Sequence, residues 1–138
     1  MEIFPCEGIG PIKFGMTPKE VENAIGIDQV YEEWMGGNLN DSLFYPGVIV
    51  GFSECNAKGP LSNSVVIEFR VNPSEHITLN GIPTTKLNVE NISNIVINNE
   101  NPTVESNGDV LYKENALSLG FLESGSLWGI EMWDCKNS

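Results

Sequence analysis

Histidine is almost absent from this sequence of 138 residues, and its scarcity argues against several kinds of catalysis. Because the chain holds one histidine, a Cys–His pair or a Ser–His–Asp triad would have to include His76. No Gly-x-Ser-x-Gly elbow is present to supply a nucleophile. His76 follows a loop-like stretch at 72–75, so we expect a solvated surface side chain there. We predict that the protein is not an enzyme and has no catalytic residues.

Basic side chains are also few. Seven Lys and Arg residues oppose nineteen Asp and Glu residues, which gives a formal charge of −12. Nucleic-acid binding depends largely on Lys and Arg that displace counterions from phosphates, so we expect no nucleic-acid partner. No apolar run reaches the length of a membrane span, and we expect no membrane partner. The charge indicates a basic protein partner, with acidity that serves only solubility as the alternative.

The three cysteines, Cys6, Cys55 and Cys135, lie far apart and lack the C-x-x-C spacing of metal sites. Their odd number favours reduced thiols over a disulfide framework. The segment 38–42 has oxygen ligands but not the order of acidic residues that a calcium loop requires. Residues 1–10 lack the basic and apolar regions of a signal peptide. We therefore expect a cytoplasmic protein without a metal or a cofactor.

The clearest local pattern predicts a short helix that begins at Pro18. Thr17 is a suitable N-cap, and Glu20 completes a T-x-x-E capping box. Gly26 is suited to end the helix. One apolar stripe is formed by residues at helical spacing, namely Val21, Ala24 and Ile25.

Strands are predicted on both sides of the middle of the chain. Apolar residues alternate within 48–52 and 65–71, and Pro46–Gly47 marks a turn after 42–45. In the second half Asn80–Gly81 is a strong hairpin signal. Asn88 is suited to cap a second helix whose apolar stripe is Val89, Ile92, Ile95 and Val96. Further strands are expected at 110–113, 117–121 and 127–133.

These patterns predict an α+β fold in a single domain, 1–138. We expect an antiparallel sheet with helices on one face, built from two weakly similar strand–helix–meander repeats, with structural halves of about 1–73 and 74–138. A single layer of helices would leave the other face of the sheet available to solvent or to a partner.

The candidate binding residues are acidic or aromatic. In 127–133 we expect Trp128 to face the core and Trp133, beside Asp134, to be partly exposed, with two core tryptophans as the alternative. Exposed aromatic side chains next to carboxylates suit a basic, Arg-rich partner. The predicted partner-binding residues are Glu32, Glu33, Trp34, Asp41, Glu123, Trp133 and Asp134.

The stretch from Gly8 to Val21, followed by Ala24-Ile25-Gly26, resembles a signature of small bacterial immunity proteins of toxin–immunity systems. The repeat pattern is similar to the tandem architecture of the β-lactamase-inhibitor-protein fold, which presents a concave sheet to another protein. The resemblance implies an antitoxin of contact-dependent growth inhibition or another polymorphic toxin system. Its partner would be a basic toxin encoded next to it, with a nuclease as the example.

Two alternatives to the antitoxin belong to other functional classes. One is an inhibitor of a different enzyme class in the manner of β-lactamase-inhibitor proteins. Secreted inhibitors of that fold carry signal peptides and disulfide-bonded repeats, which the sequence does not indicate, so we favour the cytosolic antitoxin. The other is a small self-associating structural module. A small enzyme that uses the acidic pairs Glu20/Glu22 or Glu32/Glu33 is disfavoured, because neighbouring side chains on a helix or strand diverge.

Overall fold

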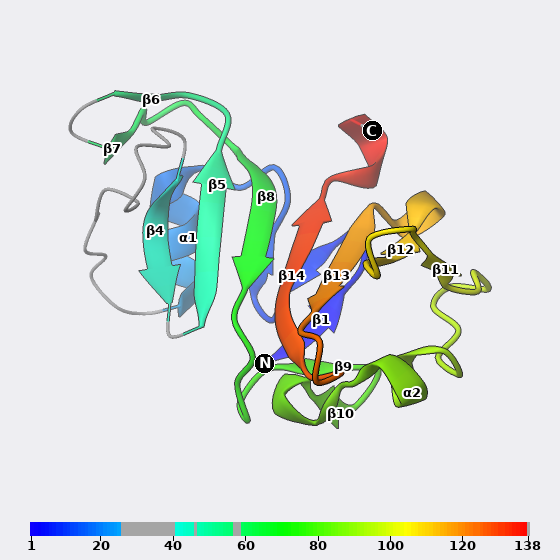
Figure 1. The fold of residues 1–138 in the computed structure, drawn as a ribbon. Helices are drawn as coiled ribbons and strands as arrows, with labels where there is room; N and C mark the ends of the chain where they lie inside the picture. Colours follow the sequence, from blue (N-terminus) through cyan, green and yellow to red (C-terminus); the bar gives the residue numbers. More distant parts are fainter. Residues whose placement is uncertain (26–40, 46, 57–58, 138) are drawn as a thin grey trace.

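The computed structural model describes residues 1–25, 41–45, 47–56 and 59–137 of the chain. Its main feature is a seven-stranded antiparallel sheet with the order β11-β12-β13-β14-β8-β5-β4 (Figure 1). The strands are β4 (Asp41–Tyr45), β5 (Val48–Phe52), β8 (Val66–Val71), β11 (Thr103–Val104), β12 (Val110–Tyr112), β13 (Leu117–Phe121) and β14 (Leu127–Trp133). In this order the strands from the first half of the chain, β4, β5 and β8, are adjacent at one end, and the strands from the second half are at the other. The two groups meet where β8 pairs with β14.

A second, five-stranded sheet has the order β10-β9-β1-β2-β3. Its strands are β1 (Glu2–Phe4), β2 (Gly8–Ile9), β3 (Ile12–Lys13), β9 (Thr78–Leu79) and β10 (Ile82–Pro83). The pair β1–β9 is parallel and joins the two halves of the chain, with Ile3 opposite Leu79. A small hairpin is formed by β6 (Cys55–Asn56) and β7 (Gly59–Pro60). The expected α+β class with mainly antiparallel sheets is confirmed.

Helix α1 (Pro18–Ile25) begins as the sequence predicts. The Glu20 amide donates to Thr17 Oγ1 over 3.3 Å, and the Thr17 amide donates to Glu20 Oε1 over 3.2 Å. This reciprocal pair is a capping box, which satisfies amides that the helix cannot bond internally. None of the helices in the described ranges is long and apolar enough to cross a membrane.

Helix α2 (Val89–Ile92) is shorter than the predicted stripe. Asn88 caps it as expected and forms a capping box with Asn91. After Ile92 the chain turns and becomes extended, with Ile95 and Ile97 buried and Val96 between them 52% exposed. The expected place of Val96 on a helical stripe is therefore wrong, because the apolar period here is two rather than three or four residues. The other helices are short 3-10 turns, η1 (Thr84–Lys86), η2 (Lys113–Asn115) and η3 (Cys135–Asn137).

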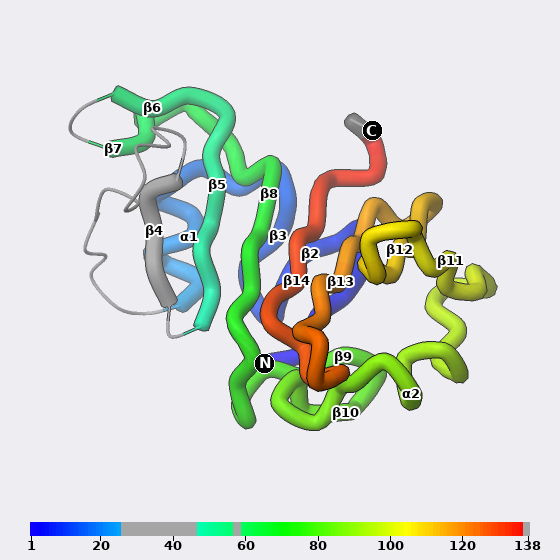
Figure 2. The backbone as a smooth tube through the Cα atoms, viewed as in Figure 1, coloured from blue at the N-terminus to red at the C-terminus, as the bar shows by residue number. Residues whose placement is uncertain are grey.

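The core lies on one side of the seven-stranded sheet. Figures 1 and 2 show α1 and the strands β1 to β3 behind this sheet, while its other face is turned to the viewer. The fully buried Phe69 of β8 meets Phe14 edge-to-face, with ring centroids 5.1 Å apart. Backbone bonds reinforce this packing, since the Gly15 amide donates to the Val66 carbonyl and the Val66 amide donates to the Met16 carbonyl.

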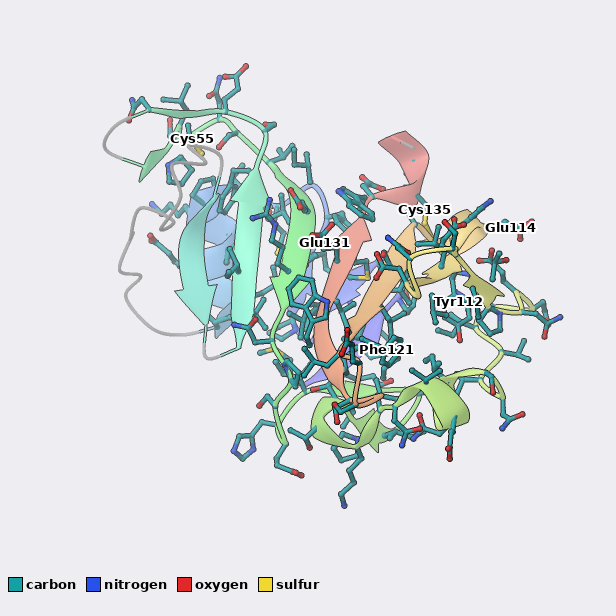
Figure 3. The ribbon with its side chains drawn as sticks, viewed as in Figure 1. Cys55, Tyr112, Glu114, Phe121, Glu131 and Cys135 are labelled. Carbon is teal, nitrogen blue, oxygen red and sulfur yellow. A yellow bond between two sulfur atoms is a disulfide. The ribbon has the colours of Figure 1, made fainter. Side chains whose placement is uncertain are left out.

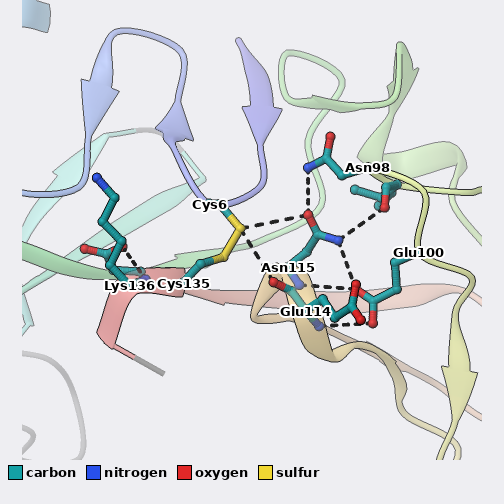
Figure 4. Close-up of a disulfide and its surroundings, with 9 residues drawn as sticks. Cys6, Asn98, Glu100, Glu114, Asn115, Cys135 and Lys136 are labelled. Atoms are coloured by element: carbon teal, nitrogen blue, oxygen red, sulfur yellow. Dashed lines mark hydrogen bonds between the residues drawn. A yellow bond between two sulfur atoms is a disulfide. The ribbon is translucent and has the colours of Figure 1, made fainter.

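The cysteines differ from the expectation of reduced thiols. Cys6, in the turn after β1, forms a disulfide with Cys135, just after β14, and their Cα atoms are 5.1 Å apart (Figure 4). The expectation was wrong for these two residues because a sequence separation of 129 residues hides their proximity in the fold. The third cysteine, Cys55, lies in β6, outside the bridge.

Candidate partner-binding site

We use the name open face for the side of the seven-stranded sheet that is turned away from α1 and the five-stranded sheet. Strand register places one row of residues across five strands of it, namely Leu111, Ser118, Glu131, Arg70 and Ile49. The neighbouring row, Tyr112, Leu117, Met132, Phe69 and Val50, is buried. Side chains alternate between the two faces of a strand, so the first row lies on the open face.

Trp128 is a large exposed side chain of the open face, with 58% of its surface accessible. The expectation that it is a core residue is wrong. Gly120 pairs with Gly129 and Phe121 pairs with Leu127, so Trp128 is the additional residue of a β-bulge. A bulge reverses the alternation of side chains locally. Leu127 is therefore buried, while the indole of Trp128 is left outside the core.

The indole of Trp128 lies against Gly120 on the adjacent strand β13. A Cβ atom built on Gly120 would overlap the Nε1 and Cε2 atoms of Trp128. Glycine at this position therefore lets the ring approach the backbone of β13 closely. This contact fixes the ring at the surface without burying it.

Beside Trp128 the open face contains a shallow cavity of about 250 Å³, which we call the tryptophan groove. Its residues come from β5, β8, β13, β14 and the segments that flank β8 and β12. They are Ile49, Arg70, Val71, Asn72, Asp109, Ser118, Gly120, Trp128, Gly129, Ile130 and Glu131. The groove therefore combines an aromatic ring, small residues and charged groups on one side of the sheet.

The lining of the groove contains both acidic and basic side chains, and they differ in their neighbours. Arg70 Nε is 3.1 Å from Glu68 Oε1, so the guanidinium already has a carboxylate neighbour on its own strand. Glu131 stands opposite Arg70 on β14 (Figure 3), yet it forms no ion pair within the described part of the chain. Asp109 accepts a hydrogen bond from the side-chain amide of Asn107 over 3.2 Å. Among the described lining residues two carboxylates thus accompany one cation, Arg70, which has the carboxylate of Glu68 beside it.

A second cavity lies at the end of the sheet where β14 terminates, and we call it the end pocket. It has a volume of about 580 Å³ and is lined by Ile67, Leu111, Tyr112, Lys113, Ala116, Leu117, Trp133 and Asp134. Trp133 is 38% exposed, so the expectation of partial exposure is confirmed. Asp134 Oδ1 accepts a hydrogen bond from the Lys136 amide over 3.1 Å.

The other predicted binding residues are scattered. Glu123 is exposed in the turn between β13 and β14, away from the end of β14 that carries Trp133. Asp41 begins β4 and pairs with Gly51. Glu32, Glu33 and Trp34 lie outside the described residues. Of the predicted set, the described structure brings Trp133 and Asp134 together in one cavity.

Sequence reasoning missed the groove residues Trp128, Glu131, Arg70 and Asp109. A sequence signal for this site does exist, because Gly120 interrupts an apolar strand segment, and a glycine there leaves room for the large indole ring. The bulge that turns this ring outward depends on the pairing of β13 with β14, which the sequence does not display.

The strongly perturbed titratable group belongs to the core rather than to a surface site. Burial, with a further contribution from the charge of Glu100, raises the pKa of Tyr112 to about 12. The Tyr112 hydroxyl donates to the Ile95 carbonyl over 2.7 Å, which is a structural bond. His76 is exposed, as expected. Among the residues that the structure describes, no three His, Cys, Asp or Glu side chains are grouped so as to hold a metal ion.

The open face therefore offers groups suited to contact with another macromolecule. An exposed indole, a partly apolar cavity and the carboxylates of Glu131 and Asp109 can bury apolar surface and attract positive charge. Comparison of the chain with protein-family models, with curated proteins and with solved structures finds no match.

Proposed function

We propose that the chain is an immunity protein that binds and neutralises a basic bacterial toxin through an acidic protein–protein interface on the open face. The observation that carries the proposal is the exposed Trp128 beside Glu131, on a sheet face that no described element covers. The proposal assigns binding and no catalysis to this protein. Neutralisation follows when the bound protein covers the toxin's active site or the surface by which it reaches its target.

The energetic basis of such an interface is a small number of aromatic anchors. Tryptophan is among the residues most enriched at binding hot spots, because it buries a large apolar area when a partner excludes water from it. Trp128 and Trp133 are 58% and 38% exposed, and β14 carries both of them. Large apolar side chains that share one exposed face favour an interaction surface over a purely solvated one.

The overall charge supports a basic partner. A formal charge of −12 on 138 residues creates a field that attracts a positively charged protein and accelerates its association. The same field opposes the approach of nucleic acids and of anionic membranes. A second copy of this chain would also be repelled, so we rank the self-associating module below the toxin inhibitor.

The tandem repeat remains part of the proposal. Each half of the chain supplies a two-stranded hairpin, a helix and an antiparallel meander, with α1 in the first half and α2 in the second. The hairpins are β2–β3 and β9–β10, and the meanders meet at the pair β8–β14. Two such units joined edge to edge make a broad sheet, and this breadth suits the grip on another protein that the β-lactamase-inhibitor-protein fold exemplifies.

The disulfide bears on the compartment in which the protein acts. Disulfides persist in oxidising compartments and are rare in the cytoplasm, where thiol systems reduce them. The Cys6–Cys135 bridge therefore favours an oxidising compartment over the cytoplasmic location that the sequence predicts. Alkylation of thiols in intact cells, followed by mass spectrometry, tests this. A fully alkylated chain, with all three cysteines labelled before reduction, would support the cytoplasm instead.

The function is tested with the product of the neighbouring toxin-like gene. We expect the purified chain to bind that protein with a Kd of about 10⁻⁹ M or below and to restore growth when the two are co-expressed. The association rate constant is expected to fall as salt concentration rises, because salt screens the attraction. A toxin that still arrests growth and does not bind the chain would overturn the proposal.

The self-associating module is tested separately by analytical ultracentrifugation of the chain alone. We expect a monomer at micromolar concentration. A stable dimer that the substitution Trp128→Ala dissociates would show that the open face is occupied by a second copy, and it would count against the toxin as the partner of that face.

A further inference from the structure

We infer that the tryptophan groove binds an arginine side chain of the partner protein. The guanidinium group of this arginine lies between the indole of Trp128 and the carboxylates of Glu131 and Asp109. This inference rests on the proposed function and deepens it, because it names the chemical group that the open face recognises. It also states where on the sheet that group binds.

The size of the groove suits a single side chain. Pockets for small molecules and cofactors typically hold about 300–1,000 Å³ and enclose most of their ligand. The tryptophan groove, at about 250 Å³, is smaller than this, and its lining includes the exposed residues Asn72 and Trp128. A long, flexible side chain of a docked protein fits such a site better than a free metabolite.

The shape of the groove suits a planar cation. Ser118 and Gly129 contribute a small side chain or none, so room remains beside the ring of Trp128, whose indole itself lies against Gly120. Tryptophan is the aromatic residue that attracts cations most strongly over its face. A guanidinium is planar and stacks on such a ring, whereas an ammonium group is a compact and strongly hydrated point charge.

The charges around the groove select a cation over an anion. Arg70 is the lining residue that would attract an anion, but its Nε atom is 3.1 Å from Glu68 Oε1. Glu131 and Asp109 then leave an excess of negative charge, within a chain of formal charge −12. Two separated carboxylates match the five N–H donors of a guanidinium, which forms paired hydrogen bonds with carboxylates.

The experiment uses the whole chain and a short probe. The chain is labelled with ¹⁵N, and its three tryptophan indole N–H signals are assigned from Trp-to-Phe variants. It is then titrated with an acetylated and amidated hexa-arginine peptide. The control peptide is hexa-citrulline, which keeps the planar shape and loses the charge. We expect saturable shifts of the Trp128 signal with arginine and none with citrulline.

Matched substitutions test the carboxylates. Glu131→Gln and Asp109→Asn are each expected to weaken the peptide affinity by on the order of tenfold, equivalent to about 1.4 kcal/mol. Glu123→Gln removes the same charge from an exposed position outside the groove and is expected to change the affinity less than twofold. The dispersion of the amide signals shows for each variant that it is folded.

Each of several results would overturn the inference. They are binding of hexa-citrulline as tight as that of hexa-arginine, shifts at another indole, and a loss of affinity in Glu123→Gln as large as in Glu131→Gln. The last result would mean that overall charge, not the groove, attracts the peptide. If a peptide of six lysines binds more tightly than hexa-arginine, the groove does not prefer a planar cation, and the inference is likewise wrong.

The inference and the proposed function fail in different ways. If the wild-type chain binds the toxin and Trp128→Ala with Glu131→Gln binds it equally well, the groove is not the recognition site, although the immunity function stands. If the arginine peptide binds the groove while the neighbouring toxin-like protein does not bind the chain, the groove is still an arginine-binding site, but the toxin is not the partner that supplies the arginine.

Discussion

Cys6 and Cys135 are joined by a disulfide that connects the turn after the first strand to the short 3-10 helix after the last strand, across a sequence separation of 129 residues. The bridge lies against η2, where the Cys6 Sγ atom is 3.8 Å from the Glu114 carbonyl oxygen and 3.9 Å from Asn115 Oδ1 (Figure 4). It therefore ties the five-stranded sheet to the end of the open face, next to Trp133 and the end pocket.

Loss of this bridge is expected to lower the free energy of unfolding by about 2–4 kcal/mol, because a disulfide that closes a long loop restricts the unfolded chain. Guanidinium-induced unfolding of the Cys6→Ser/Cys135→Ser double variant, compared with the oxidised wild type, measures the effect.

The matched control is Cys55→Ser, since Cys55 lies outside the bridge. Reduction of the wild type should reproduce the stability of the double variant, and reduction of the double variant should change nothing. Equal midpoints for oxidised and reduced wild type would show that the bridge does not contribute to stability.

The buried phenol of Tyr112 predicts a loss of stability in alkaline solution. Its pKa is raised from 10.0 to about 12 in the folded chain, chiefly by burial. Between these values the unfolded chain releases the proton while the folded chain retains it, so a rise in pH favours unfolding. This group alone gives a slope of up to about 1.4 kcal/mol per pH unit, and the stability it confers is complete below pH 10.

Tyr112→Phe isolates this contribution. The variant is expected to lose about 1 kcal/mol at neutral pH, because the hydrogen bond to the Ile95 carbonyl is removed. Above pH 10 its stability should fall less steeply than that of the wild type. Denaturant titrations at several pH values measure both slopes, and parallel slopes would contradict the assignment of a raised pKa to Tyr112.

Features encoded by neighbouring residues were predictable from the sequence. The caps of α1 and α2 depend on pairs three residues apart, Thr17 with Glu20 and Asn88 with Asn91, so their spacing is visible in the chain itself. The α+β class with mainly antiparallel sheets followed from such local patterns, whereas the second, five-stranded sheet did not. Within the described residues no helix or strand covers the other face of the seven-stranded sheet, which agrees with the expected free face, and its use as a binding site stays a prediction.

Features that depend on contacts between distant segments were not predictable in the same way. Simple alternation along β14 placed Trp128 in the core, and a bulge opposite Gly120 and Phe121 moved it to the surface. The sequence separation of Cys6 and Cys135 likewise concealed their bond. Strand register and chain topology decide both outcomes, and one sequence does not reveal either of them.

The carboxylate of Glu100 organises the turn at η2. It accepts hydrogen bonds from the Glu114 amide over 3.0 Å, the Asn115 amide over 3.2 Å and the Asn115 side-chain amide over 2.9 Å. Asn115 is only 3% exposed, so after Glu100→Ala its backbone amide would lack its partner and its side-chain amide would keep only the bond to the Ile97 carbonyl. We expect this variant to lose about 2–3 kcal/mol of stability.

Glu114→Ala is the matched control for Glu100→Ala, because it removes an exposed carboxylate from the same turn and keeps the backbone amide. Its expected cost is below about 0.5 kcal/mol. Thermal unfolding followed by circular dichroism measures both variants. If the two lose equal stability, the surface charge of this region matters and the hydrogen bonds to Glu100 do not.

The contact between Gly120 and Trp128 predicts that a single methyl group will displace the indole. In Gly120→Ala the new Cβ atom would overlap the ring atoms, so the ring must leave the backbone of β13. We expect a red shift of the tryptophan fluorescence and loss of the Trp128 response to the arginine peptide, with a change in unfolding free energy of about 1 kcal/mol or less. Gly129→Ala is the control for the emission shift alone, because Gly129 lines the groove and its added Cβ atom would come no closer than 3.5 Å to the Val71 carbonyl oxygen. An unchanged emission spectrum in Gly120→Ala, or the same shift in both variants, would show that the ring is not held against Gly120.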